Sequence, residues 1–337
     1  MMSLEKAAKT AIETCMGVRQ GENVVIVSDG RTLNIGKELR KAALDATNGV
    51  RFFNLDIYGK RPLDYFPNAI DKAAKNADVT FWTAHSYEGE LETTRRPFIE
   101  AAMIGGRHAH MVDITEKVME DALAVDYKVL DEFTHKLTDK LKETHEVRVT
   151  NPQGTDIKVS FNERWKWVPS TGICKLPGHW HNLPGSEVYT APRRMEGKIV
   201  VDGILGEYFS NMFSHSDLQK TPLTVKVENK ERPKCVDLKC ENKDILEKVQ
   251  KYLSLHDCSS YVGEFGMGTN VFLKEISGNT LQDEKFPGVH IAFGDPMASE
   301  TDADWSCPQH LDMILTKCNV WLDDEKVMEE GEYLLGY

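Results

Sequence analysis

The first 145 residues alternate short apolar runs with segments whose apolar positions follow helical spacing. Val24 to Val27 is a β-branched run, and residues 34–46 then repeat apolar side chains at helical intervals. Because strands that alternate with helices favour a parallel sheet flanked by helices, we predict an α/β domain over residues 1–145. Further strands are predicted at 50–58, 79–83 and 108–112, and further helices at 68–76, 95–104 and 126–144.

After residue 145 the pattern changes to strands and turns. Residues 146–150 and 156–161 flank an Asn-Pro-Gln-Gly turn, which is typical of two strands joined by a tight connection. One clear helix is predicted over residues 243–255, so this half of the chain predicts a mixed α+β domain over residues 146–337. Other strand-like segments lie at Lys198–Leu205, Leu223–Val227, Tyr261–Phe265, His290–Phe293 and His310–Leu315.

The composition is that of an ordinary globular protein. A chain of 337 residues is long enough for two domains, and its hydrophobic fraction of 41% is sufficient for two cores. The 53 acidic residues against 41 basic ones give a net charge of −12. That balance argues against nucleic acid or an anionic membrane as the main partner. No segment approaches the ~18 apolar residues that a membrane-spanning helix needs.

The seven cysteines are scattered and lack the paired spacing of a structural zinc site. We predict reduced, mostly buried thiols, as in proteins of the cytosol. The N-terminal segment has no apolar core of signal-peptide length. Together these features predict a cytoplasmic protein.

Candidate chemistry lies in the second half of the chain, and its sharpest motif is His310-Leu311-Asp312. In a strand, residues two apart project to the same side, so His310 and Asp312 point together while Leu311 faces the opposite way. His290 interrupts another apolar, strand-like run. Taken alone, it is better explained as a core histidine bonded to a neighbouring carbonyl, and only the other motifs favour a ligand.

Two glutamates occupy unusual settings. Glu187 follows a Pro-Gly-Ser sequence and is predicted in a defined loop or at the start of a strand, although an exposed glutamate is the ordinary alternative. Glu264 lies in the run Val-Gly-Glu-Phe-Gly, where burial of its charge would be costly without a counter-ion such as a metal. The polar segment 281–285 could reach the same site through Asp283 or Glu284, but a solvated loop is the more ordinary interpretation.

These motifs occur in an order that resembles a known family. They are Asn182–Pro192, Gly263–Glu264, Leu281–Glu284, His290–Gly294 and His310–Asp312. The order resembles the thermophilic metalloprotease family, the aminopeptidase T and aminopeptidase S group of leucyl aminopeptidases. The resemblance covers residues 180–315 closely, and the alternation of strands and helices before them is compatible with the first domain of that family.

The resemblance implies a site with two divalent ions of zinc, cobalt or manganese. Three carboxylates neutralise most of the charge of two such ions and leave an electrophilic centre that acidifies water. The implied activity is that of a metal-dependent aminopeptidase, which removes N-terminal residues from peptides through a metal-bound hydroxide, and the implied assembly is a homodimer. The implied ligands are Glu187, Glu264, His290, His310 and Asp312, of which Glu187 and Glu264 are also the catalytic candidates.

Three further residues are candidates for substrate binding. His181 lies in a Gly-His-Trp-His run that either lines a pocket or forms a surface metal trap, and Arg193 could bind a substrate carboxylate, although arginines are ordinarily solvated. The family carries a tyrosine seven positions after its His-x-Ala-x-Gly histidine, where the hydroxyl can stabilise an oxyanion. This chain has Met297 there, and a thioether donates no hydrogen bond. By residue type, Tyr189 and Tyr261 are candidates to replace that tyrosine.

Two other functions stay open. Ring-opening dioxygenases that act on dihydroxypyridine resemble the same family and hold one iron ion through two nitrogen ligands and one carboxylate. The position of Glu264 looks to be a histidine in that branch, so a glutamate favours the hydrolase. The third alternative is a protein that binds a metal or a ligand without turnover. Metal content separates the three, because they predict two zinc-like ions, one iron ion or none.

Overall fold

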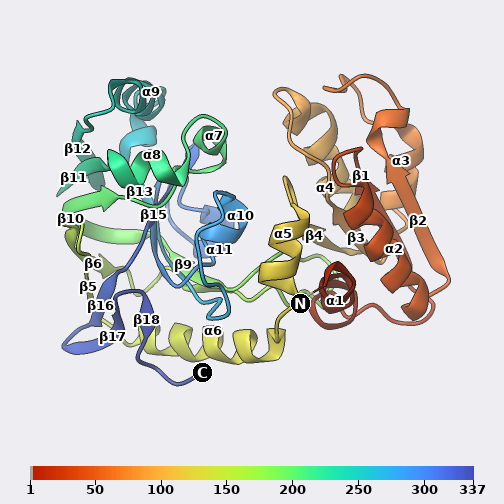
Figure 1. Ribbon diagram of the computed structural model, residues 1–337, viewed down its shortest axis with the longest axis horizontal. Coiled ribbons are helices and arrows are strands. Elements are labelled where there is room, and N and C mark those ends of the chain that lie inside the picture. Colours follow the sequence, from red (N-terminus) through yellow and green to blue (C-terminus); the bar gives the residue numbers. More distant parts are fainter. Residues whose placement is uncertain (1–2) are drawn as a thin grey trace. The chain divides into compact units, whose positions relative to one another are not determined.

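The computed structural model describes residues 3–337, which form two compact units (Figure 1). The first unit contains the chain up to Asp131 and the segment Gly172–Gly185, and the second contains Glu132–Thr171 and Ser186–Tyr337. The sequence pattern places a single boundary after residue 145. In the structure the chain passes from one unit to the next within helix α6 (Tyr127–Lys142) and a short segment later returns to the first unit.

The first unit is built on a five-stranded parallel sheet in the order β2-β1-β3-β4-β8. The returning segment supplies its edge strand, β8, which pairs with β4. The strands are β1 (Asn23–Ser28), β2 (Gly49–Asn54), β3 (Val79–Trp82), β4 (Arg107–His110) and β8 (Trp180–Asn182).

Helices cover both faces of this parallel sheet. Val25 and Val27 of β1 pack in a cluster with Ile70 and Phe98 from the helical segments α3 and α4. The other face lies against α2, where a Cβ atom at Gly36 would approach Ser28 Oγ to 2.1 Å. The helical segments are α1 (Leu4–Lys9), η1 (Thr10–Cys15), α2 (Leu33–Ala46), η2 (Leu55–Ile57), α3 (Asn68–Ala74), η3 (Leu91–Arg95), α4 (Arg96–Ala102), α5 (Glu116–Val118) and η4 (Met119–Leu123).

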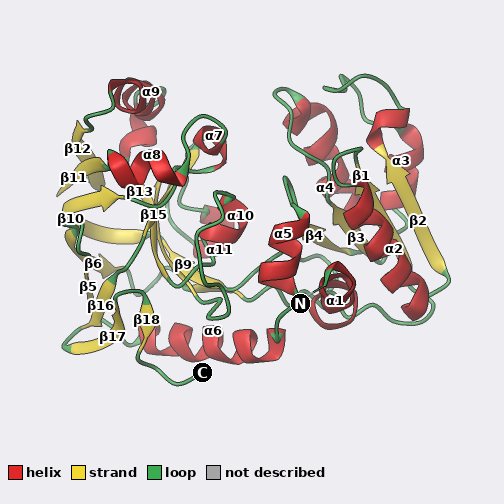
Figure 2. Ribbon diagram, in the orientation of Figure 1, coloured by secondary structure: helices red, strands yellow, loops and turns green. Residues whose placement is uncertain are grey.

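The second unit contains two antiparallel sheets, drawn in yellow in Figure 2. The eight-stranded sheet has, in order, β12 (Pro233–Lys239), β11 (Leu223–Asn229), β10 (Pro192–Val201), β6 (Asp156–Phe161), β5 (Glu146–Thr150), β16 (Asn319–Leu322), β17 (Glu325–Glu329) and β18 (Glu332–Tyr333). The five-stranded sheet has, in order, β15 (His310–Leu315), β14 (Gly288–Gly294), β13 (Val262–Gly268), β9 (Glu187–Thr190) and β7 (Val168–Ser170). The shorter helices are α7 (Glu207–Ser210), α8 (His215–Lys220), α9 (Lys243–Leu253), η5 (Asp257–Ser260), α10 (Thr280–Asp283) and α11 (Ala298–Thr301).

One hydrophobic core joins the two antiparallel sheets. Phe265, Ile291 and Met313 from the five-stranded sheet share a buried cluster with Val159 and Ile199 from the eight-stranded sheet. Each such side chain stabilises the fold by about 1.5–3 kcal/mol relative to an exposed one. Because side chains alternate along a strand, burial of these positions turns their neighbours in β13, β14 and β15 to the opposite face.

A parallel sheet with flanking helices and a second, mixed region of antiparallel sheets and short helices confirm the predicted fold class. Among the described residues, none of the helices combines the length and the apolar character needed to traverse a bilayer.

Candidate metal centre

One face of the five-stranded sheet carries carboxylates and imidazoles on four neighbouring strands. The strand residues between them point into the core on the other face, as the strand alternation requires. The structure therefore brings all five of the predicted ligands to one face of one sheet. They are Glu187 on β9, Glu264 on β13, His290 on β14, and His310 and Asp312 on β15.

The five side chains form two overlapping groups. His290 Nε2 lies 2.9 Å from Glu264 Oε1 and 3.5 Å from Glu187 Oε2. His310 Nε2 lies 3.3 Å from Asp312 Oδ1 and 3.5 Å from Glu264 Oε2. In each group, one ligand atom from each of three residues lies within 4.8 Å of the others. Glu264 belongs to both groups and turns a different oxygen to each histidine, so the geometry suits two cations that share one carboxylate.

Glycines on both sides of Glu264 make this geometry possible. Gly266 is the cross-strand partner of His290, and a Cβ atom there would lie 2.0 Å from His290 Nε2. The strand register shifts between Val262 and Glu264, and a Cβ atom at Gly263 would lie 2.5 Å from two backbone carbonyl oxygens. A bulge of this kind re-aims the side chain that follows it. The two glycines thus let the imidazole lie across β13 and direct the glutamate toward it.

The orientation of His310 is fixed by a backbone contact. Its Nδ1 lies 3.0 Å from the carbonyl oxygen of Asp295, which can only accept a hydrogen bond. Nδ1 therefore carries the proton, and Nε2 is left to face Glu264 and Asp312. Histidines that bind metals commonly use one ring nitrogen for the ion and the other for such a partner.

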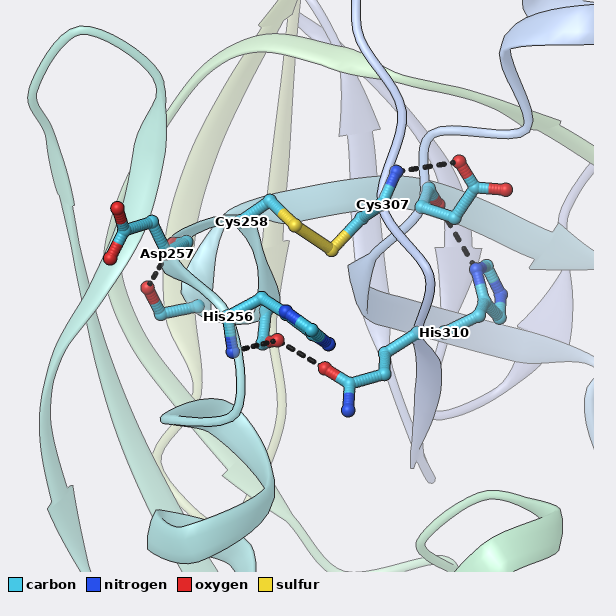
Figure 3. Close-up of a disulfide and its surroundings, with 9 residues drawn as sticks. His256, Asp257, Cys258, Cys307 and His310 are labelled. Carbon is cyan, nitrogen blue, oxygen red and sulfur yellow. Dashed lines mark hydrogen bonds between the residues drawn. A yellow bond between two sulfur atoms is a disulfide. The ribbon is translucent and has the colours of Figure 1, made fainter.

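A disulfide between Cys258 and Cys307 lies next to this contact (Figure 3). The Cys307 N–H donates a hydrogen bond to Asp295 Oδ1 at 3.3 Å, and the same aspartate orients His310 through its carbonyl. The prediction of reduced thiols is wrong for this pair, because folding brings together two cysteines that are 49 residues apart in the sequence. The remaining cysteines are free thiols, namely Cys15, Cys174, Cys235, Cys240 and Cys318.

The acid–base properties of the cluster report an excess of negative charge. Burial alone would lower the pKa of His290, but its hydrogen bond to Glu264 and the charges of Glu264, Glu187 and Asp312 together outweigh burial and raise the pKa to about 9. Burial opposes the shift of His310 as well, and Asp312 together with Glu264 raises its pKa to about 10. Burial would raise the pKa of Asp312, but His310 lowers it to about 2. The raised pKa values of the two histidines favour additional positive charge in the cluster, and the lowered pKa of Asp312 keeps its carboxylate negative beside them.

Lys285 and Glu284 also belong to this cluster, and the sequence interpretation of segment 281–285 as a solvated loop is wrong. The Lys285 side chain is fully buried, and its Nζ lies 2.5 Å from Glu187 Oε1 and also contacts the Glu284 carboxylate. Burial raises the pKa of Glu284 to about 8, although the lysine opposes the shift. An adjacent acid and lysine resemble an exposed ion pair in sequence, so only the tertiary contact with Glu187 reveals their burial.

Tyr189 lies on the face of the sheet that carries the cluster. It is the cross-strand partner of Gly266, it is 7% exposed, and its hydroxyl donates a hydrogen bond to Glu300 Oε2 at 2.7 Å. Burial raises its pKa well above the ordinary value, and the charges of Glu300 and Glu264 add to that shift. Glu300 lies in α11, the short helix that Met297 begins in a left-handed conformation with φ of 52°. The sequence pattern gave no reason to single out Glu300.

The other candidates for substrate contact are on other elements of the fold. Arg193 is exposed on β10 of the eight-stranded sheet. His181 is half-buried on β8, in the first compact unit. Tyr261 precedes β13, where its ring lies 5.6 Å from that of Trp305 and has the Lys234 ammonium 5.4 Å from its centroid. Tyr189 interacts electrostatically with the ligand glutamates Glu264 and Glu187.

The donor set fits a divalent metal ion. Carboxylate oxygens and imidazole nitrogens are the ligands that zinc, cobalt and manganese use in hydrolytic sites, and the same set can hold iron. The buried carboxylates exceed the nearby permanent positive charge, because among the described residues Lys285 is the one lysine or arginine in an ion pair with Glu187 and Glu284. A divalent cation would therefore offset a real electrostatic cost in this part of the protein.

Comparison with known proteins gives three findings. The family model for the thermophilic metalloprotease (M29) family matches residues 107–310. No curated protein matches. The solved structure of 2,5-dihydroxypyridine dioxygenase from Pseudomonas putida KT2440 is similar with a TM-score of 0.70 and 17% identity, over 99% of this chain and 97% of that chain. Wild-type AmpT from Thermus thermophilus is similar with a TM-score of 0.68 and 17% identity, over 98% of this chain and 99% of that chain. At these identities the two structures demonstrate a shared fold.

Gly266→Ala should weaken metal binding, because the added methyl group would displace the His290 ring. We expect a loss of affinity for Zn²⁺ or Mn²⁺ of about 10–100-fold, as for other disturbances of ligand orientation. Isothermal titration of the metal-free protein measures the effect. Gly336→Ala is the matched control, since a Cβ atom there meets nothing within 4 Å. Equal affinities for the two variants would contradict the role assigned to Gly266.

Proposed function

The chain belongs to the thermophilic metalloprotease (M29) family and is a metal-dependent peptidase, and we propose that it acts as an aminopeptidase that removes N-terminal residues from peptides. The observation that carries the proposal is the pair of ligand groups that share Glu264. Such a pair suits two ions of zinc, cobalt or manganese.

Bound divalent ions would supply Lewis acidity, which polarises a scissile carbonyl and lowers the pKa of water. The protein supplies the arrangement around them. Glu187 and Glu264 are the proposed catalytic carboxylates, since both are buried at the cluster and Glu264 joins its two halves. A strongly acidic site also attracts the α-amino group of a peptide, which supports cleavage at the N-terminus over cleavage of internal bonds.

Tyr189 is the proposed hydrogen-bond donor to the oxyanion that forms during hydrolysis. Met297 occupies the position at which a tyrosine is expected from the family resemblance, and its thioether cannot donate. The hydroxyl of Tyr189 lies beside the cluster, and its one proton, which is donated to Glu300 in the free site, would turn to the oxyanion when substrate binds. His181 and Arg193 stay predictions as substrate-binding residues, and so do the homodimer and the cytoplasmic location.

The proposed activity predicts metal-dependent release of N-terminal residues. Protein treated with a chelator and then loaded with zinc, cobalt or manganese should hydrolyse part of a broad panel of aminoacyl amides and peptides, with apolar N-terminal residues among the substrates. Peptides with a blocked N-terminus should be inert. Release that does not depend on metal, or no release from any member of the panel by the reconstituted protein, would exclude the proposal.

Tyr189→Phe should lower kcat by about 100-fold, the typical loss when one oxyanion donor is removed. Tyr261→Phe is the control, because its ring packs against Trp305 and it has no contact with the ligand glutamates among those described. Metal content, measured by elemental analysis, should be the same in both variants. If the two substitutions reduce kcat to the same extent, Tyr189 is not the donor.

A second candidate function is a mononuclear iron dioxygenase of the dihydroxypyridine type. The group Glu264, His310 and Asp312 could hold a single ion, with the Glu264 carboxylate in place of the second nitrogen ligand expected for the dioxygenase, and a solved dioxygenase shares the fold. Elemental analysis of protein purified without added metal separates the two functions. Two zinc-like ions per chain favour the peptidase, and one iron ion with oxygen consumption on a dihydroxypyridine favours the dioxygenase.

A further inference from the structure

Lys285 places a fixed positive charge within the candidate metal centre. It follows α10 and Glu284, its side chain is 0% exposed, and its Nζ lies 2.5 Å from Glu187 Oε1. The same ammonium contacts Glu284.

This ammonium is in direct contact with a ligand of one half of the cluster. Glu187 uses Oε1 for Lys285 and has Oε2 3.5 Å from His290 Nε2, so a single oxygen of this glutamate faces the group that includes His290. The other group, with His310 and Asp312, has no such contact among the described ion pairs. The two cation positions therefore differ in the carboxylate oxygens available to them and in their distance from a fixed cation.

Glu284 is restrained by the same contact. Through Lys285 it is linked to Glu187, a ligand of the half that includes His290. Its bond to Lys285 balances its charge and holds it as a partner of the ammonium. Without the lysine, two carboxylates would gain oxygens able to face a metal ion, and a repulsive charge would be gone.

We propose that Lys285 makes the two cation positions unequal: it weakens divalent-ion binding at the Glu187, Glu264 and His290 position, so that the Glu264, His310 and Asp312 position fills first. The inference rests on the proposed metal centre and is independent of which peptides the protein cleaves. Lys285 is thus a specificity-determining residue for metal occupancy that contacts a ligand and is itself no ligand.

Titration of the metal-free full-length protein with Mn²⁺ or Zn²⁺ at fixed pH tests the proposal. The unaltered protein should bind in two steps whose dissociation constants differ by about tenfold or more. Lys285→Met should tighten the weaker step by about tenfold and change the stronger step less. Asp312→Asn should remove the stronger step and leave the weaker one, which assigns each step to its position.

Glu284→Gln provides a second variant with an effect of opposite sign. It leaves Lys285 with Glu187 as its remaining carboxylate partner, so the weaker step should weaken further. A lysine that merely supports folding would weaken binding, or leave it unchanged, in both variants. Lys226→Met, at an exposed lysine paired with Glu228, is the control and should leave both steps unchanged.

The outcomes also separate this inference from the proposed function. Two equal steps in the unaltered protein, or a weaker step that fails to tighten in Lys285→Met, would overturn the inference and leave the peptidase proposal intact. If Lys285→Met does not fold, Lys285→Gln, which keeps a polar side chain without the charge, takes its place, and the same tightening of the weaker step is expected. Absence of any divalent-ion binding by the unaltered protein would overturn the metal centre and both proposals with it.

Discussion

The structure of the second unit depends on one electrostatic constraint, the burial of several carboxylates on one face of an antiparallel sheet. Like charges that are removed from water repel one another and lose hydration, so they persist only where positive charge offsets them. Lys285 provides part of that charge, and the two histidines are poised to take up more. Divalent cations bound on either side of Glu264 would offset the remaining negative charge.

The surrounding fold determines where the side chains of this cluster point. The alternation of β13, β14 and β15 sends apolar side chains into the shared core and leaves the opposite face for ligands. Gly266 gives the His290 ring its space, and the bulge before Glu264 directs the carboxylate. Asp295 orients His310 and is bonded in turn to the disulfide-linked Cys307, so backbone, bulge and disulfide all act on the positions of ligand atoms.

Much of this arrangement is readable from local sequence. The alternation in His310-Leu311-Asp312 predicts the strand of β15 and the shared direction of its two polar residues, and the turn between β5 and β6 predicts both of those strands. The full ligand set could be identified only through the family resemblance. No local pattern shows that Glu187 begins a buried strand, where it is the cross-strand partner of Gly268.

What the sequence could not predict depends on contacts between distant segments. Lys285 beside Glu284 has the local appearance of a solvated pair, and its burial follows only when β9 brings Glu187 against it. The disulfide joins Cys258 to Cys307 across 49 residues, and no spacing rule indicates it. The edge strand β8 returns to the parallel sheet from beyond α6, so a single domain boundary could not describe the chain.

The shared fold of a dioxygenase and of AmpT at 17% identity means that the architecture alone does not select the reaction. The most direct test of the account is a crystal structure of the zinc- or manganese-loaded protein with anomalous diffraction at the absorption edge of the metal. We predict two anomalous peaks that flank the Glu264 carboxylate, one toward Glu187 and His290 and one toward His310 and Asp312, at about 2.0–2.2 Å from the ligand atoms. A fully loaded crystal with no peak at bonding distance from Glu264 would contradict the account.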